Sequence, residues 1–361
     1  MKIVLRLLWS GGVARIALAL AKETGSELIV YRRSDKNFFY NSNEYDLTTL
    51  FDGSYNRIFK KFLEIITEFH ASNRGKDATV DLDYIIMASK RVSGQIVYMD
   101  PYAGITGLIR KILIGENYAV FSHETSFAKK KEKGLRFLLP KIIDLFVLKK
   151  AKLVITNSQW NTDILSKYKI NSIPVLPGCY PIDQPMEKKG TKIIAVTLWD
   201  KRRNPDIYAH ISKIICRKIT LVGNWPEPLF RYEIEKKYSE YLEITGAVSE
   251  EELYNLYAEG VIYIRFGFEE RGPGMGGLEA LSHGIPVITN DGLGMKEYIK
   301  NGYNGYVVSS EEEAACRINE VLNNRDLQQE LSKNAYESSK QYSWNNQVKK
   351  LKEILNDAFL T

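Results

Sequence analysis

The sequence predicts an α/β protein with two parallel-sheet domains in tandem, and three observations support this prediction. Short apolar runs alternate with helical patterns through most of the chain, which is typical of buried parallel strands joined by helices. Residues 177–190 interrupt the alternation with three prolines, two glycines and a charged tail. The alternation then begins again. A length of 361 residues also fits two domains.

The first half opens with a strand, a glycine turn, a helix and a second strand, which is the start of a parallel α/β unit. Residues 2–9 form a mostly apolar run, residues 10–12 read Ser-Gly-Gly, and residues 13–23 place apolar side chains at helical spacing. The further strands expected in this half are 27–33, 84–89, 95–100, 118–123 and 153–158.

The second half repeats the pattern and ends in helices. Two predicted helices, 250–260 and 276–284, each end on a glycine, the usual helix stop. Residues 327–361 are also predicted to be helical, and Trp344 opens the final helix. The strands expected in this half are 192–199, 218–225, 242–246, 260–266, 286–291 and 305–309.

These breaks divide the chain into an N-terminal domain and a C-terminal domain. The expected boundaries are residues 1–178, a linker at 179–190, a second domain at 191–340, and a final helix at 341–361 that packs back toward the first domain.

Composition excludes several classes of protein. Hydrophobic residues make up 44% and charged residues 26%, which is ordinary for a globular chain and argues against disorder. The three cysteines are far apart, with no pair at zinc-binding spacing, so we expect a reducing, cytoplasmic compartment. No uncharged apolar run reaches the roughly 18 residues of a membrane-spanning helix, and no signal peptide is apparent. The net charge of +6 suits an anionic ligand, an acidic membrane surface, or simply a solvated surface.

A glycine-rich loop within residues 266–290 is the strongest chemical signal. It follows a predicted strand and leads into a predicted helix, so its N–H groups can face a phosphate. Glu279 lies near the start of that helix. Its carboxylate would repel phosphate but could bind two neighbouring hydroxyls, such as a ribose diol. The alternative is a glutamate that only complements the helix dipole.

Three weaker signals occur at other predicted strand ends. The glycine turn at 10–12 precedes a helix, and the cations of residues 200–205 could neutralise a diphosphate; each could also be a simple surface turn. His123 ends a strand and could bind substrate or stabilise a leaving phosphate, or be structural.

Residues 128–152 mix apolar and basic side chains, as in a helix lying on an anionic membrane or a buried helix with a basic rim.

Taken together, these segments resemble the family 4 glycosyltransferases. The similarity covers nearly the whole chain and is strongest from residue 191 onward. The segments that carry it are SGGVARIALALAKE (10–23), AKLVITNSQWNTDIL (151–165), TGAVSEEELYNLYAEG (245–260) and GLEALSHGIPVITNDGLGMKEYIKNGYNGYVV (277–308). The resemblance implies the GT-B fold, in which two Rossmann-like parallel-sheet domains face each other across a cleft.

The family's E-x7-E motif fits this sequence at only one of its two glutamates. Glu279 matches the second, which the resemblance implies binds the donor ribose hydroxyls. The position of the first is Arg271, and Glu270 is adjacent. Either the loop shifts by one residue and Glu270 takes the catalytic, sugar-binding role, or Arg271 occupies that place and suits an anionic sugar such as a uronic acid.

The resemblance also implies roles for residues outside the motif. His123 matches a histidine near the transferred sugar, and Gly12 matches the glycine beneath the diphosphate. The other implied donor-binding residues are the cations Lys201 and Arg203 and the backbone segment of Gly272, Gly274 and Met275.

The activity that follows is transfer of a sugar, of the hexosyl type, from a nucleotide-diphosphate sugar to a glycan or lipid-linked acceptor, with retention. The resemblance implies no side-chain nucleophile, no cofactor and no metal, because cations neutralise the diphosphate. The expected partners are the donor, the unknown acceptor and an anionic membrane surface, with no nucleic acid. The alternatives are a non-catalytic nucleotide-sugar-binding subunit and a GT-B epimerase or phosphorylase.

Overall fold

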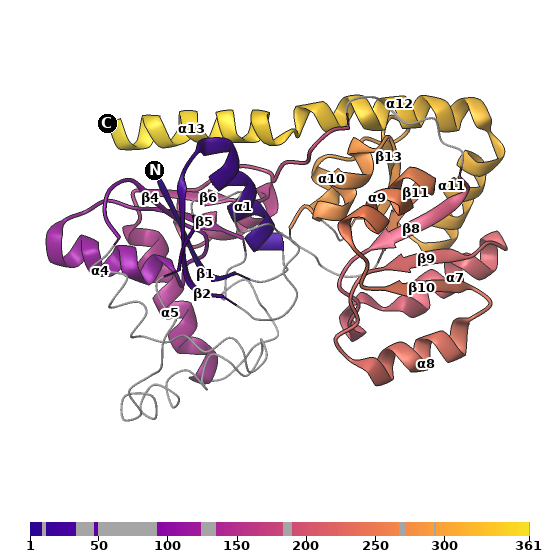
Figure 1. The fold of residues 1–361 in the computed structure, drawn as a ribbon, viewed down its shortest axis with the longest axis horizontal. Coiled ribbons are helices and arrows are strands. Elements are labelled where there is room, and N and C mark those ends of the chain that lie inside the picture. The colour runs from indigo at the N-terminus through magenta and orange to yellow at the C-terminus, as the bar shows by residue number, and fades with distance from the viewer. Residues whose placement is uncertain are drawn as a thin grey trace. The chain divides into compact units, whose positions relative to one another are not determined.

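The structure is a computed structural model of the chain. The residues that it describes are 1–8, 12–33, 47–49, 92–123, 135–182, 190–266, 272–291 and 294–360. The chain divides into two compact units (Figure 1): Met1–Val175 together with Val348–Thr361, and Leu176–Gln347. The strand expected at 84–89 and the first part of the basic stretch, 128–134, lie outside the described residues.

A parallel sheet forms the core of the first unit. Its strands are β1 (Lys2–Leu8), β2 (Glu27–Arg33), β3 (Leu47–Thr49), β4 (Ile96–Tyr98), β5 (Ala119–Ser122), β6 (Leu153–Thr156) and β7 (Ile173–Pro174). Its helices are α1 (Gly12–Thr24), α4 (Gly104–Ile114), α5 (Leu135–Lys150) and α6 (Gln159–Ser166). Among the described residues the sheet has seven strands in the order β3-β2-β1-β4-β5-β6-β7, all parallel. The five expected strands within these residues are confirmed, whereas β3 and β7 are too short to leave a pattern.

A second parallel sheet forms the core of the second unit. Its strands are β8 (Lys192–Val196), β9 (Ile219–Val222), β10 (Leu242–Gly246), β11 (Gly260–Arg265), β12 (Val287–Asn290) and β13 (Gly305–Val308). Its helices are η3 (Lys201–Arg203), α7 (Pro205–Ile215), α8 (Pro228–Tyr238), α9 (Glu250–Glu259), α10 (Met275–Ser282), η4 (Gly294–Glu297), α11 (Glu311–Asn323) and α12 (Arg325–Gln341). The described sheet has six parallel strands in the order β10-β9-β8-β11-β12-β13, which confirms all six expected strands.

In both sheets the chain begins at a central strand, adds strands toward one edge, and then returns to add strands on the other side of the first strand. In the second sheet the chain moves from β8 out to β10, then returns to the other side of β8 at β11. In the first sheet β1 and β4 have the same relation. Such a change leaves a crevice beyond the carboxyl ends of the two neighbouring strands, where ligands bind in open α/β sheets.

The apolar pattern of the strands follows from their burial. In β8, Ile193, Ile194 and Ala195 are at most 1% exposed, so successive side chains on both faces of the sheet are covered. A parallel strand buried on both faces reads as a continuous apolar run, which is why these strands were predictable.

Helix ends confirm part of the sequence prediction. Gly284, just beyond α10, has φ +68°, the left-handed conformation that favours glycine. Gly260 instead begins β11 with φ −72°, so it is not a left-handed stop for α9. Its role is packing, since a Cβ there would lie 3.0 Å from Cδ1 of Ile194. Trp344 opens the last helix, α13 (Trp344–Leu360), as expected.

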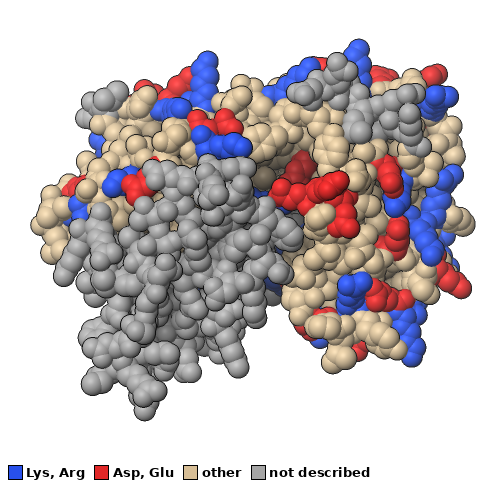
Figure 2. All heavy atoms as spheres, viewed as in Figure 1, with Lys and Arg blue, Asp and Glu red and all other residues tan. Residues whose placement is uncertain are grey.

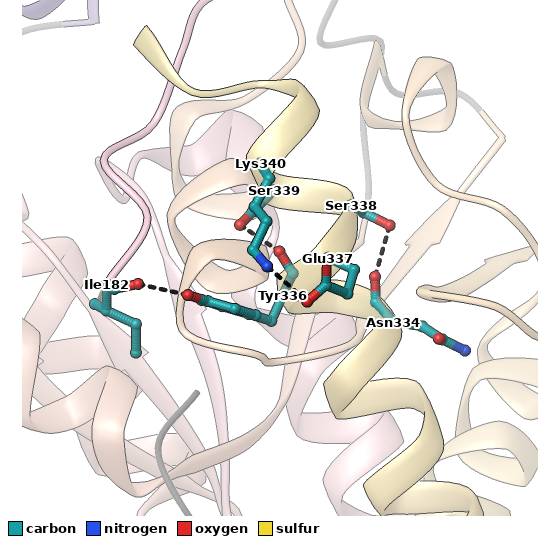
Figure 3. A network of polar contacts seen from close by, with 7 residues as sticks. All are labelled: Ile182, Asn334, Tyr336, Glu337, Ser338, Ser339 and Lys340. Atoms are coloured by element: carbon teal, nitrogen blue, oxygen red, sulfur yellow. Dashed lines mark hydrogen bonds and ion pairs between the residues drawn. The ribbon is translucent and has the colours of Figure 1, made fainter. Parts of the chain in front are cut away.

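The segment that enters the second unit is bonded to the segment that leaves it. The amide of Cys179 donates to the carbonyl of Tyr342 at 2.8 Å, and the amide of Trp344 donates to the carbonyl of Cys179 at 3.0 Å. Next to this pair, Tyr336 Oη of α12 donates to the carbonyl of Ile182 at 2.8 Å (Figure 3). Side-chain bonds within α12, such as Ser338 to Asn334, flank this contact. These hydrogen bonds hold together the two segments that connect the second unit to the first.

The end of α13 belongs to the first unit. Val348, Leu351 and Leu355 are at most 3% exposed and lie at helical spacing on one face. Among the helices of the described residues, none has both the length and the apolar character needed to cross a bilayer.

Candidate functional site

The candidate site of the second unit lies beyond the carboxyl ends of β8 and β11. These strands pair in parallel, and the chain leaves them toward opposite edges of the sheet, to β9 and to β12. The segment after β8 carries the cations of η3, and the segment after β11 leads into α10. Both segments carry residues that are predicted to bind the donor, and the topology places the two segments at the ends of neighbouring strands.

Glycines at the start of α10 allow it to approach the sheet closely. The helix begins after Gly274, whose φ is +68° and which has no side chain to cap the helix. A Cβ on Gly276 would lie 2.6 Å from Tyr263 Oη, and one on Gly277 would collide with Tyr298 Oη. Close packing therefore requires glycine at these two positions, and this requirement could not be predicted from the sequence. The first N–H groups of a helix lack an intrahelical acceptor, so this end favours an anion.

The start of α10 lies against the end of β8. Tyr263 Oη donates to the carbonyl of Val196, the last residue of β8, at 3.1 Å, and a Cβ on Gly276 would lie 3.2 Å from that oxygen. Tyr298 Oη donates to the carbonyl of Pro273 at 2.8 Å and fixes the approach to the helix. Gly272 and Met275, on either side of this point, are half-buried. An anion at the first turn of α10 would thus lie beside the segment that leaves β8.

Glu279 is the fifth residue of α10, and its side chain is half-buried. Its Oε2 accepts a hydrogen bond from Tyr257 Oη at 3.0 Å. The stabilisation of a carboxylate by the helix dipole falls off within the first turn. The dipole therefore explains Glu279 poorly, and binding of ligand hydroxyl groups stays the prediction for it.

The three cations of η3 have different surroundings. Asp200 caps the turn by accepting the amide of Arg202 at 2.9 Å, and its Oδ2 accepts Arg202 Nη2 at 2.6 Å. Partial burial raises the pKa of the Asp200 carboxyl, but the bonds and charge of Arg202, with the charge of Arg203, outweigh it and lower this pKa. Arg202 is 82% exposed and belongs to the surface turn.

The two predicted phosphate ligands of η3 also differ. Lys201 is 70% exposed and forms an ion pair with Glu227 at 3.4 Å. Exposed pairs of this kind contribute about 0–1 kcal/mol, so Lys201 resembles a solvated surface charge. Arg203 is half-buried and its Nε is enclosed. Of the two predicted cations, Arg203 is therefore the more enclosed.

Arg265 is a second cation of this region that the sequence analysis missed. It is the last residue of β11, is only 3% exposed, and places Nη1 3.5 Å from Tyr208 Oη. The signal was present, because a charged residue ends an otherwise apolar strand. Its position at the end of β11 places it at the switch point, next to the segment that leads into α10.

His123 follows β5 in the first unit and is buried. Its ring stacks on Phe121 with centroids 4.5 Å apart, and its carbonyl accepts Asn161 Nδ2 at 3.0 Å. Within the described residues neither ring nitrogen has a hydrogen-bond partner. Burial lowers the pKa of the imidazole to about 4, against a smaller opposing effect of the Asp100 charge. His123 is therefore a neutral, enclosed imidazole at the carboxyl edge of the sheet.

The buried His123 predicts a dependence of stability on pH. In the unfolded chain its pKa is about 6.5, so below that pH the unfolded state binds more protons and the free energy of unfolding falls. The loss is complete below pH 4 and amounts to about 3 kcal/mol. Urea unfolding at pH 7 and 4.5 should give a steeper loss for the wild type than for His123→Leu. Parallel losses in the two proteins would contradict the prediction.

Gly12 is the first residue of α1 and is exposed. Among the described atoms, a Cβ at this position would meet nothing within 4 Å. Packing therefore does not require glycine here, in contrast to Gly276, and room for a ligand stays the predicted reason.

Two predicted site residues, Glu270 and Arg271, lie outside the described residues. In the part of the chain that is described, no group of three or more histidine, cysteine or acidic side chains is arranged to hold a metal ion.

Comparison with known proteins supports a glycosyltransferase domain in the second unit. Residues 187–338 match the family described as "Glycosyl transferases group 1". Sulfoquinovosyl transferase SQD2 of Arabidopsis thaliana is 24% identical over 140 residues, which are 37% of this chain and 27% of that protein. The chain thus matches about a quarter of the length of this curated relative.

Solved structures share the fold over nearly the whole chain. Anabaena Alr3699/HepE in complex with UDP has a TM-score of 0.76 at 13% identity and covers 99% of this chain and 100% of that one. WaaG, a glycosyltransferase involved in lipopolysaccharide biosynthesis, has a TM-score of 0.70 at 16% identity, with 98% and 99% covered. A glycosyltransferase from Rickettsia africae has a TM-score of 0.69 at 17% identity, with 99% and 97% covered. The expected two-domain GT-B fold is confirmed.

Proposed function

We propose that this protein is a retaining family 4 glycosyltransferase that moves a hexosyl group from a nucleoside-diphosphate sugar to an acceptor hydroxyl. The observation that supports this most is the start of α10 at the switch point. There, an uncapped helix start packed by glycines follows β11 and a half-buried arginine follows β8, and a tyrosine of α9 holds the carboxylate of Glu279 within α10. Diphosphate and ribose are the two groups that such a set suits.

The chemistry follows from the leaving group. As the sugar departs, negative charge grows on the inner oxygen of the diphosphate, and preorganised N–H groups and Arg203 stabilise it. The sugar becomes oxocarbenium-like and needs an acceptor hydroxyl held close. Neutral His123 is proposed to contact the transferred sugar with a ring nitrogen, and Gly12 to leave room for the diphosphate. No side-chain nucleophile and no cofactor are part of the proposal.

Binding of nucleotides tests the donor site. UDP is the first nucleotide to use, because HepE was solved with UDP and with UDP-glucose. Calorimetric titration should show UDP binding to the wild type and binding at least tenfold weaker to Glu279→Gln, with the melting temperature nearly unchanged. Equal affinity for both proteins would remove Glu279 from the site.

Turnover separates the proposed transferase from its alternatives. Incubation with a panel of nucleotide sugars and a glycan or lipid-linked acceptor mixture should release nucleoside diphosphate and lengthen an acceptor. Binding without release would indicate a non-catalytic subunit. Conversion of the donor sugar without transfer would indicate an epimerase, and phosphate-dependent release of a sugar phosphate would indicate a phosphorylase. Transfer should also persist in EDTA, since the proposal requires no metal ion.

We further propose that an anionic membrane is a partner, because the acceptor is expected to be lipid-linked. At the end of α4, Ile112, Leu113 and Ile114 are 74%, 73% and 64% exposed. The neighbouring helix α5 contacts the start of α4 through Val147 and carries the 56% exposed Phe146 and lysines in its last turn. Exposed apolar side chains and lysines suit an anionic bilayer surface.

Vesicle binding tests this partner. The triple variant Ile112→Ser, Leu113→Ser, Ile114→Ser should lose co-sedimentation with phosphatidylglycerol vesicles, which the wild type should retain at low salt. The control is Leu229→Ser on α8, a site that is 79% exposed and should not matter. If the triple variant bound the vesicles as well as the wild type does, this surface would be excluded as the membrane-binding site.

Location and other partners complete the proposal. The three cysteines are free thiols, which agrees with a reducing, cytoplasmic setting. On the face shown in Figure 2, acidic side chains gather near the centre, and basic side chains stand apart from them in smaller groups. Nucleic acid would need a basic stripe, and it is not proposed as a partner.

A further inference from the structure

Tyr257 of α9 is buried behind the candidate site and contacts its carboxylate. The side chain is 2% exposed, and Oη lies 3.0 Å from Oε2 of Glu279 and 3.3 Å from the carbonyl oxygen of Gly276. Both neighbours are acceptors, so the hydroxyl donates its single proton between them. One hydroxyl thereby joins the carboxylate to the first turn of α10.

The ring of Tyr257 is itself fixed. The imidazole of His283 stacks on it with centroids 4.9 Å apart and an angle of 21° between the planes. His283 follows α10 directly, and its Nδ1 lies 2.8 Å from the carbonyl oxygen of Glu279. The two ends of α10 therefore hold the tyrosine ring, and the tyrosine hydroxyl in turn holds the side chain of Glu279.

We propose that Tyr257 is a positioning residue that orients Glu279 toward the two ribose hydroxyls of the nucleotide. This inference rests on the proposed function. A glutamate side chain has three rotatable bonds, and holding Oε2 in place fixes the plane of the carboxylate before the ligand arrives. A vicinal diol donates two hydrogen bonds to one carboxylate, so orienting it in advance lowers the entropy lost on binding. Tyr257 acts through Glu279 and does not itself contact the ligand.

The variant Tyr257→Phe isolates the hydroxyl, because the ring and its stacking on His283 are kept. We expect UDP to bind about tenfold more weakly, and the preference for UDP over 2′-deoxy-UDP to shrink. The melting temperature should fall by only a few degrees, as for loss of one hydrogen bond. Tyr303→Phe is the matched control, since this tyrosine is 43% exposed in the same unit. Tyr303→Phe should leave the UDP affinity and the preference for UDP over 2′-deoxy-UDP unchanged.

A double-mutant cycle distinguishes positioning from general packing. If Tyr257 acts through Glu279, then adding Tyr257→Phe to Glu279→Gln should weaken UDP binding no further. Two outcomes overturn the inference. In the first, Tyr257→Phe binds UDP, and prefers it over 2′-deoxy-UDP, as strongly as the wild type does. In the second, the losses of UDP affinity from the two substitutions add fully in the double variant. Both leave the proposed function intact if Glu279→Gln alone still weakens binding. A wild-type protein that binds no nucleoside diphosphate would overturn the inference together with the proposed function.

Discussion

Arg203→Ala is expected to lower the rate of sugar transfer by about 30- to 1,000-fold, because it removes about 2–4 kcal/mol of transition-state stabilisation. The half-buried guanidinium follows β8 at the switch point, where charge builds on the leaving diphosphate. The loss should appear in kcat/KM with the best donor of the panel. Affinity for the intact nucleotide sugar should fall less, because the charge on the bridging oxygen exists only as the bond breaks.

Lys201→Ala provides the matched comparison, since it removes a cation from the same turn. Its side chain is 70% exposed and paired with Glu227, so we expect a loss of less than about tenfold. If kcat/KM of Arg203→Ala were within twofold of the wild-type value, the turn would be only a surface feature. Equal large losses in the two variants would mean instead that the turn moves Lys201 inward when the donor binds.

Glu270→Ala is expected to abolish most transfer while leaving UDP affinity nearly intact. If the loop before α10 is shifted by one residue relative to the family motif, Glu270 contacts the sugar, whereas base and ribose are bound elsewhere. Steady-state transfer together with calorimetric UDP binding measures both quantities. Arg271→Ala should then have a mild effect.

The opposite outcome would identify a different donor. If Arg271 occupies the sugar position, its guanidinium suits a carboxylate on the sugar through a bidentate pair. Arg271→Ala would then abolish use of a uronic-acid donor, and Glu270→Ala would change little. Assays of both variants with neutral and charged donors decide between the two arrangements, and the result that favours Arg271 contradicts the shift.

Much of the fold could be predicted from the sequence because parallel strands are buried on both faces. Ile193 to Ala195 in β8 show why, since consecutive apolar residues leave a run that is easy to recognise. The two-residue strand β7 leaves no such run. Its pairing with β6 depends on the neighbouring strand rather than on its own residues.

The site could be predicted only where its residues follow strand ends or glycines. Glu279 and Arg203 are predicted in this way. Tyr257 is not, because a tyrosine on an amphipathic helix has the pattern of a core residue, and only the tertiary contact with Glu279 reveals its hydroxyl. Likewise, the packing of Gly276 against Tyr263 depends on residues distant in sequence.

A structure of the protein in complex with a UDP-sugar would show directly whether the donor binds at α10. We predict that the ribose hydroxyls lie within hydrogen-bonding distance of the Glu279 carboxylate, still held by Tyr257, and that the diphosphate lies between the first turn of α10 and Arg203. A nucleotide bound elsewhere, or bound at α10 with its ribose turned away from Glu279, would contradict the account.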